Sequence, residues 1–275
     1  MRFCRLLCLL LALLLCLPLV GCGAGAEGLT VRVLGVGQSD CVLLSLAGEH
    51  ILIDTGTASQ RDTVLATLSS LGVRELAYLI VTHPHEDHYG NARFVLETHT
   101  VKGLLLSPAE SEDVGYLWMQ DAARQQGVPM QTVADGMTFS LGGATVEVFC
   151  ARPQAADPND ASLVLRVHYG ACRMLFMGDA EQEAEAALLV AWGADTACDL
   201  LKVGHHGSDT ACSAEFLTAT APALAAISCG KDNEDAFPHR AVLEGLDAVG
   251  AAVYRTDLLG TLCFYCDGER IVYDE

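Results

Sequence analysis

Residues 81–90 read Val81-Thr82-His83-Pro84-His85-Glu86-Asp87-His88-Tyr89-Gly90, with four candidate metal ligands within six positions. The apolar run at residues 76–81 leads into them and is typical of a buried strand. His83 and His85 are two positions apart, so both can point to one side of an extended backbone. Asp87 and His88 need the chain to turn and would face a second point. The stretch therefore predicts two neighbouring metal positions at a strand end, with zinc expected and manganese or iron as alternatives.

The alternative interpretation of this stretch is a histidine-rich surface turn that binds nothing. Pro84 and the spacing of the histidines exclude the helical H-E-x-x-H zinc motif. The pattern H-x-H-x-D-H resembles the signature of the metallo-β-lactamase superfamily. That resemblance implies an α+β fold, an αββα sandwich of two mixed β-sheets flanked by helices, over residues 29–275. Periodicity alone indicates only that strands and helices are mixed.

Further segments narrow the resemblance, because they follow one another in the expected order over most of residues 29–275. As a set they are similar to the metallo-β-lactamase-like domain of ComEC-type competence proteins. Two departures are Gly35, where the family usually has Asp, and His85, where it often has Asp. The segments are Val36-Gly37-Gln38-Ser39-Asp40, Ile51-Leu52-Ile53-Asp54-Thr55-Gly56, Asn159-Asp160-Ala161-Ser162-Leu163-Val164-Leu165, Phe176-Met177-Gly178-Asp179-Ala180-Glu181, Lys202-Val203-Gly204-His205-His206-Gly207-Ser208 and Arg255-Thr256-Asp257-Leu258-Leu259-Gly260-Thr261.

The remaining metal ligands are expected at the ends of later strands. Asp179 closes an apolar run, and the resemblance implies that it bridges the two metals; a helix N-cap is the alternative, and both roles can hold. One of His205 and His206 should complete the second metal, while the other contacts a substrate oxygen or supports a ligand. Where many relatives place a histidine, this chain has Asn159 and Asp160 as candidate substitutes. Such an oxygen ligand predicts a labile position, or one that takes manganese.

Four residues carry further expectations. Asp54 ends a predicted strand and should orient a ligand histidine or its loop. His239, in Phe237-Pro238-His239, is a candidate phosphate contact or general acid, with an ordinary exposed loop histidine as the alternative. Lys202 is interpreted as a strand-end charge. Asp87 is assigned to the catalytic centre as well as to the metal.

These features predict a metal-dependent hydrolase with two divalent ions. The sequence contains no Gly-x-Ser-x-Gly elbow and so gives no sign of a protein nucleophile. A water ionised between the two cations is therefore the expected nucleophile. The resemblance favours phosphodiester substrates, such as nucleic acid or a wall polymer. The alternatives are β-lactamase-type amide hydrolysis and a non-catalytic binding lipoprotein. A formal net charge of -19 argues against binding of a polyanion through the overall charge of the protein.

The N-terminus is typical of an export signal. Arg2 and Arg5 precede an apolar run at residues 6–20, too short for a comfortable membrane span. The run ends in Leu19-Val20-Gly21-Cys22, which resembles a bacterial lipobox. We therefore expect a signal peptide at 1–21, lipidation of Cys22, a tether at 22–28 and an extracytoplasmic protein held at the membrane, with ordinary secretion as the alternative.

Secondary structure follows from periodicity. Most cysteines lie in apolar runs and are expected to be small core residues; a metal or redox C-x-x-C at Cys263 and Cys266 is the alternative. Strands are predicted at 29–36, 41–46, 51–53, 76–81, 101–105, 137–141, 144–150, 162–169, 173–177, 200–203, 224–228, 252–256, 261–265 and 270–273, and helices at 60–71, 91–97, 114–126, 181–192, 212–220 and 241–249.

Overall fold

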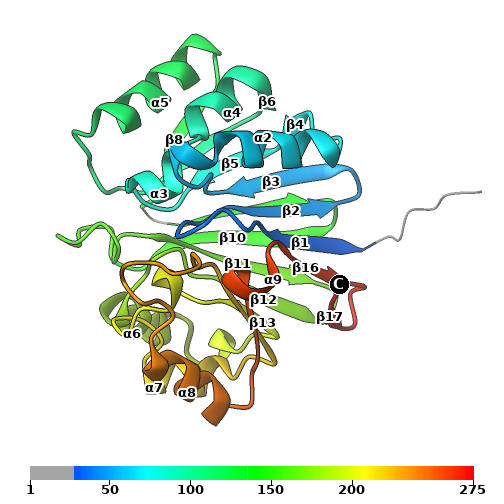
Figure 1. Ribbon diagram of the computed structural model, residues 1–275, viewed down its shortest axis with the longest axis vertical. Coiled ribbons are helices and arrows are strands. Elements are labelled where there is room, and N and C mark those ends of the chain that lie inside the picture. The colour runs from blue at the N-terminus through cyan, green and yellow to red at the C-terminus, as the bar shows by residue number, and fades with distance from the viewer. Residues whose placement is uncertain (1–27, 135) are drawn as a thin grey trace, which may run out of the picture.

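The computed structural model describes residues 28–134 and 136–275. Within these ranges two large β-sheets lie face to face, and helices cover both outer faces (Figure 1). The first sheet has the strand order β17-β16-β1-β2-β3-β5-β7-β8, and the second has β15-β14-β13-β12-β11-β10-β9. This layering confirms the predicted αββα sandwich.

The first sheet takes strands from both ends of the described chain, because β16 pairs with β1. The β1, β2 and β3 strands pair antiparallel, as their short connections predict. Its strands are β1 (Leu29–Val33), β2 (Val42–Leu46), β3 (Glu49–Ile53), β5 (Tyr78–Val81), β7 (Leu104–Leu106), β8 (Met130–Thr132), β16 (Leu262–Cys266) and β17 (Ile271–Tyr273).

The second sheet begins with two antiparallel hairpins and continues with parallel strands. Its strands are β9 (Met137–Leu141), β10 (Ala144–Cys150), β11 (Leu163–Tyr169), β12 (Cys172–Phe176), β13 (Leu200–Lys202), β14 (Leu224–Ile227) and β15 (Ala252–Arg255).

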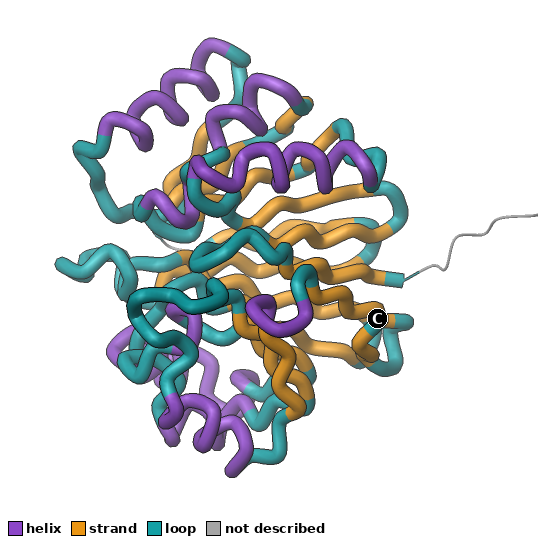
Figure 2. The backbone as a smooth tube through the Cα atoms, viewed as in Figure 1, coloured by secondary structure: helices purple, strands orange, loops and turns teal. Residues whose placement is uncertain are grey.

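Helices lie on the outside of the sandwich, as Figure 2 shows. In α5 (Val114–Gln125), Asp113 caps the N-terminus by accepting from Gly115 N at 2.7 Å, and Gly127 follows the C-terminus with φ 68°. The other helices are α2 (Arg61–Ser70), α3 (Glu86–Tyr89), α4 (Ala92–Thr98), α6 (Gln182–Trp192), α7 (Ala214–Thr220), α8 (Arg240–Ala248) and α9 (Thr256–Leu259), with short 3-10 turns η2 (Ala58–Gln60), η3 (Gly193–Thr196) and η4 (His205–Gly207).

Three apolar layers hold the sandwich together. The central layer, between the sheets, contains Phe176 and Phe264, both fully buried. One outer layer packs α2, α4 and α5 on the first sheet, and the other packs α6, α7 and α8 on the second. Each large side chain buried there contributes about 1.5–3 kcal/mol relative to exposure. Successive side chains of a strand point to opposite faces of its sheet, so each sheet contributes apolar side chains to the central layer and to one outer layer.

The strand directions decide where loops meet. In the first sheet β3, β5, β7 and β8 run parallel, and in the second β12, β13, β14 and β15 do. Parallel strands send their carboxyl ends to one edge of a sheet, where ligands bind in open α/β arrangements. The two edges face each other: Leu163 N donates to Thr82 O at 2.8 Å across the sheets. The candidate ligands follow strands that end at this edge.

Two predicted strands are wrong in detail. The run at 76–81 is split into β4 (Glu75–Leu76) and β5, and the run at 101–105 into β6 (Thr100–Val101) and β7. The chain leaves the main sheet there, because β4 and β6 pair with each other. Periodicity cannot show such a change of partner. The short α3 and α9 helices and β8 were not predicted, because segments of three or four residues carry little periodic signal.

The cysteines of the described residues are free thiols, and all but Cys263 are buried. Cys266 lies in the layer between the sheets. Residues three apart on a strand face opposite sides, so Cys263 and Cys266 cannot form a metal or redox pair within β16. The prediction of small core residues therefore fits seven of the eight thiols.

Candidate metal centre

Asp54 anchors the ligand loop from behind. Its carboxylate accepts hydrogen bonds from the Thr82 backbone N–H and hydroxyl, both at 2.8 Å. It also lies 2.8 Å from His88 Nδ1. Because a carboxylate only accepts, His88 Nδ1 carries a proton and donates to Asp54. These contacts match the expected role of Asp54 in orienting a ligand histidine and its loop.

Four candidate ligands from the two sheets converge at one point. Asp87, His88, Asp179 and His206 each offer one ligand atom, and these atoms lie within 4.8 Å of one another. Asp179 Oδ2 is 3.2 Å from His88 Nε2 and 3.6 Å from His206 Nε2. His206 Nε2 is 3.1 Å from Asp87 Oδ2. The convergence expected of distant strand ends is therefore present.

A second group lies on the other side of Asp179. His83 Nε2 is 2.9 Å from His85 Nδ1 and 3.9 Å from Asp179 Oδ2. His83 is buried and His85 is exposed, so this group opens toward solvent. Asp179 thus faces both groups, as a bridging carboxylate must.

The donor atoms suit divalent cations. His88 Nε2 and Asp179 Oδ1 are buried and have no hydrogen-bond partner among the described residues. Buried polar atoms nearly always have partners, so such atoms amid imidazoles and carboxylates indicate a site prepared for a cation. His206 Nδ1 lies 3.0 Å from Ser228 O, which fixes its proton there and directs Nε2 inward. These residues are able to hold a dinuclear metal site, and the nitrogen and oxygen donors suit zinc, manganese or iron alike.

The electrostatics of the centre are strongly coupled. Burial would lower the pKa of His88, but the carboxylates of Asp179, Asp54 and Asp87 outweigh it and raise the pKa well above its usual value. Burial would raise the pKa of Asp87, but His88 and His206 outweigh it and lower the pKa. The pKa of His83 falls well below its usual value, first through burial and then through His88. The cluster therefore sets a positively charged His88 among carboxylates and a neutral His83 beside it.

The histidine doublet divides into two positions. His205 and His206 have φ angles of 43° and 52°, a strained region for residues other than glycine. This turn brings His206 into the cluster and places His205 beside Glu181, whose Oε1 lies 2.8 Å from His205 Nδ1. His205 Nε2 is 4.0 Å from Asp179 Oδ2, and its side chain is 22% exposed. The geometry favours His206 as the ligand and puts His205 on the open side.

The two candidate substitutes for the absent histidine also separate. Asp160 is engaged elsewhere, because Oδ2 lies 2.7 Å from Arg152 Nη1 and Oδ1 accepts from Ala184 N at 3.2 Å. Asn159 Oδ1 is buried without a hydrogen-bond partner in the described chain, and Nδ2 lies 3.5 Å from Glu181 Oε1. The geometry therefore favours Asn159, whose ligand role stays a prediction.

His239 does not join the converging groups. Its Nδ1 accepts from Asp209 N at 3.0 Å, and its Nε2 lies 3.2 Å from Asp235 O. Both ring nitrogens are thus occupied by the loops beside α8. The contacts place His239 among these loops, and its expected role as a phosphate contact or general acid stays a prediction.

Sequence reasoning missed a buried pair below the centre. Lys202 Nζ lies 2.7 Å from Asp40 Oδ2, and both side chains are almost fully buried. Lys202 is therefore not the strand-end charge that we predicted. The segment containing Asp40 carries family resemblance, but nothing in its local pattern shows that it meets a lysine from the second sheet.

Comparison with known proteins identifies the family. A family profile described as the metallo-beta-lactamase superfamily matches residues 34–231. The chain belongs to the metallo-β-lactamase superfamily. It is 31% identical over 256 residues to ComE operon protein 3 of Bacillus subtilis, covering 84% of this chain and 32% of that protein. It is 32% identical over 238 residues to competence protein ComA of Neisseria gonorrhoeae, covering 85% of this chain and 32% of that protein.

The chain therefore spans about a third of the length of these metallo-β-lactamase relatives. Solved structures show the same fold at low identity. YhfI from Bacillus subtilis aligns with a TM-score of 0.55 at 13% identity, covering 82% of this chain and 95% of that one. CmlA, a diiron β-hydroxylase from Streptomyces venezuelae, aligns with a TM-score of 0.55 at 16% identity, covering 90% of this chain and 54% of that one. The fold thus accommodates more than one chemistry.

The predicted signal peptide, the lipidation site Cys22 and all but the last residue of the predicted tether at 22–28 lie outside the described residues. Among the residues that are described, no helix combines the length and apolar character needed to cross a membrane.

Proposed function

We propose that this chain is a metal-dependent hydrolase that cleaves phosphodiester bonds. The observation that supports it most strongly is the convergence of Asp87, His88, Asp179 and His206, with their ligand atoms within 4.8 Å of one another. His83 and His85 lie on the other side of Asp179 and would hold a second ion. Two divalent ions held there would supply a Lewis acid and lower the pKa of a shared water toward ~7.

The protein's own groups would keep the ligands in place. Asp54 retains the proton on His88 Nδ1, and the Ser228 carbonyl does the same for His206. Such partners fix the tautomer and orientation of a ligand imidazole. Ser162 Oγ lies 3.3 Å from His83 Nδ1 and accepts from Asp179 N at 3.2 Å, so it links the two groups of ligands. Little reorganisation is then needed when the ions bind.

The substrate would approach over the exposed His85 and the partly exposed Asp87 and His205. The contact with Glu181 holds the proton on His205 Nδ1, so Nε2 faces the open side of Asp179. In the neutral form Nε2 is an acceptor, and in the protonated form it donates to a phosphate oxygen. We assign His205 to substrate contact on this basis.

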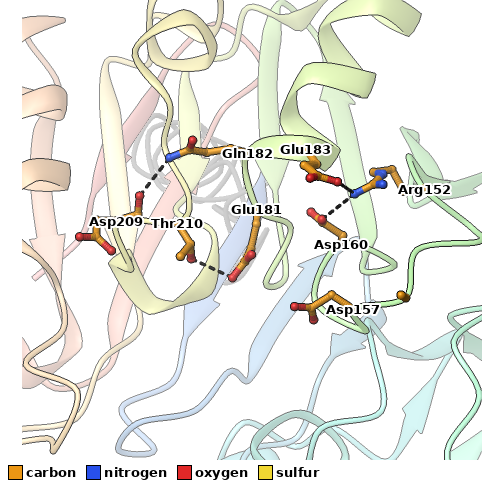
Figure 3. A pocket seen from close by; sticks show the side chains of 9 residues that line it. Arg152, Asp157, Asp160, Glu181, Gln182, Glu183, Asp209 and Thr210 are labelled. Carbon is orange, nitrogen blue, oxygen red and sulfur yellow. Dashed lines mark hydrogen bonds and ion pairs between the residues drawn. The ribbon is translucent and has the colours of Figure 1, made fainter.

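Glu181, the partner of His205, also lines a cavity of about 580 Å³ (Figure 3). Its one guanidinium, Arg152, is paired with Asp160 and Glu183. Its other charged groups are carboxylates, and like the net charge of -19 they oppose a polyanion running through it. The cavity is lined by Arg152, Ala156, Asp157, Asp160, Glu181, Gln182, Glu183, Asp209 and Thr210.

The names of two relatives are the reason for preferring phosphodiesters as the substrate class. One is named a competence protein and the other a recombination protein, which points to nucleic acid. The acidic surroundings instead favour a substrate with few phosphates near the centre, such as a wall polymer or a short nucleotide.

We propose an extracytoplasmic setting, with the protein attached to the membrane through a lipid on Cys22. Loss of radiolabelled palmitate incorporation in Cys22→Ala would test the anchor.

Hydrolysis of bis-p-nitrophenyl phosphate tests the proposal. Purified protein supplied with zinc or manganese should cleave it, and a chelator should stop cleavage. Asp179→Asn should lower the rate by at least about 100-fold, the upper end for groups that merely support a ligand. Asp62→Asn is the matched control, since Asp62 is exposed on α2. Cleavage of nitrocefin instead would identify an amide hydrolase, and no cleavage of either by metal-loaded protein would contradict the proposal.

A further inference from the structure

Lys202 and Asp40 form an ion pair beneath the metal centre. The Lys202 side chain is 1% exposed and the Asp40 side chain 3% exposed. Lys202 Nζ lies 2.7 Å from Asp40 Oδ2 and donates to Val203 O at 2.8 Å. Lys202 ends β13 of the second sheet, whereas Asp40 lies in the β1–β2 loop of the first. The pair therefore joins the sheets beneath the point where their ligands meet.

Asp40 contacts ligands from both sheets. Its backbone N–H donates to Asp87 O at 3.2 Å, and its Oδ1 lies 3.4 Å from His206 Nδ1. Its own carbonyl accepts from Gly56 N at 2.7 Å, which holds the loop. Asp87 and His206 approach each other from different sheets at 3.1 Å, beside the second such pair of His88 and Asp179 at 3.2 Å. Asp40 is thus placed to set the distance between them.

Stability alone does not account for a buried pair of this kind. Removing two charges from water costs several kcal/mol per ion, and well-packed apolar replacements are often neutral or stabilising. Without the ammonium, Asp40 would need another donor, and the His206 imidazole is within 3.4 Å. A shift toward it would draw the ring away from Ser228 O, its present partner at 3.0 Å. The location of the pair therefore indicates a role in placing the ligands that Asp40 contacts.

We propose that Lys202 is a positioning residue of the metal centre. By holding Asp40, it keeps Asp87 of the first sheet and His206 of the second at the spacing that one divalent ion requires. The inference shares one premise with the proposed function, namely that divalent ions bind at this centre. It concerns the position formed by Asp87, His88 and His206, and leaves the position formed by His83 and His85 unaffected.

The double variant Lys202→Met/Asp40→Asn tests this inference, because it removes both charges and leaves no buried ion alone. We expect metal-free double variant to unfold at nearly the same temperature as the unaltered protein. One of its two ions should bind about 10–100-fold more weakly in chelator competition, the range for groups that orient ligands. In the cobalt-loaded double variant, the visible absorption of only one of the two bound ions should change. Lys202→Met alone should also weaken folding, since Asp40 is left uncompensated.

The matched control is Arg166→Met/Glu147→Gln, which removes an ion pair between β10 and β11. It should leave both affinities and the cobalt spectrum unchanged. If the Lys202/Asp40 double variant binds both ions like the unaltered protein, the proposal is wrong. Failure of the double variant to fold would equally contradict it and make the pair a stability element. These readouts are independent of phosphodiester cleavage, so an inactive protein with this binding pattern would refute only the proposed function.

Discussion

The orientation of His205 and His206 separates two roles that their adjacency leaves open. His206 Nε2 lies within 3.6 Å of both Asp87 and Asp179 oxygens, while His205 lies beside Glu181. We therefore expect His206→Ala to lose one of the two ions. We expect His205→Ala to keep both but to lower turnover by about 100-fold, as for removal of an acid–base or charge-stabilising group.

Metal analysis and the rate of bis-p-nitrophenyl phosphate cleavage, measured on the same preparations, check this pair. Loss of an ion from His205→Ala with full retention in His206→Ala would reverse the assignment.

The protonation of His206 predicts how metal binding depends on pH. Burial would lower its pKa, but Asp179, Asp40 and Asp87 outweigh it and raise the pKa to about 10. The metal-free ring is then protonated near neutral pH and must release its proton to bind a cation. Apparent affinity should therefore rise with pH up to about 10. Calorimetry in buffers of different ionisation enthalpy should detect released protons, and buffer-independent heats would contradict this.

The raised pKa of His206 also makes the stability of the metal-free protein depend on pH, but stability should fall with pH where metal affinity rises. Because the folded pKa of His206 exceeds its usual value of 6.5, its stabilising contribution is complete below about pH 6.5 and is lost as pH rises toward 10. Thermal unfolding of metal-free protein across this range should show stability falling with pH.

At the scale of residues, local pattern was enough for the ligands of one loop. The histidines and Asp87 of that loop share the spacing of a metal motif, and Asp87 and His88 join the converging cluster. Lys202 and Asp40 were missed because their partnership joins two sheets, and no local spacing encodes it. The role of His239 stays a prediction, because the sequence of a loop does not show which groups its histidine contacts.

Among the elements, α3 is the one that turns the ligand loop, and Gly90 closes it. A Cβ on Gly90 would lie 2.5 Å from Ala58 N and 2.7 Å from the carbonyl oxygens of Glu86 and Gly56. Gly90→Ala should therefore destabilise the protein by about 1–3 kcal/mol, as overpacking does, and weaken metal binding by moving α3.

Gly72→Ala is the control for this prediction. Gly72 has φ 71°, and a Cβ added there would meet no atom within 4 Å, so the variant should cost about 1–2 kcal/mol from backbone strain alone. Its metal binding should be unchanged. Equal metal binding by both glycine variants would show that α3 does not depend on Gly90.

The elements themselves were predicted well where a full period was available. The hairpin of β9 and β10 matches its prediction at both strands, and α5 differs by one residue. The parallel order of β12 to β15 was not predicted, because pairing between strands separated by helices leaves no mark in the local pattern.

For the whole molecule, the site joins two sheets, so metal binding should stabilise the fold. At an ion concentration 100 times the dissociation constant, one site adds about 2.7 kcal/mol. That should raise the midpoint of thermal unfolding by several degrees for a chain of this size. Differential scanning calorimetry with and without chelator checks it. An unchanged midpoint would mean that the ions bind the unfolded chain equally well or do not bind.

The two-sheet architecture came from the resemblance to a family and not from periodicity. Residues such as Phe176 and Phe264 were recognisable as buried, but which sheet each belongs to depends on β16 returning to pair with β1. That pairing joins residues more than 200 positions apart, as Leu29 and Cys266 show. No short-range pattern contains it.

Every role assigned to these residues depends on two divalent ions being held between the sheets by Asp179 and its neighbours. The direct measurement is the number of ions per chain, by elemental analysis of protein dialysed after loading with zinc or manganese, beside Asp179→Asn and the Asp62→Asn control. We predict close to two ions per chain for the unaltered protein and the control, and fewer than one for Asp179→Asn. Unaltered protein that keeps no ion, or Asp179→Asn that keeps both, would contradict it.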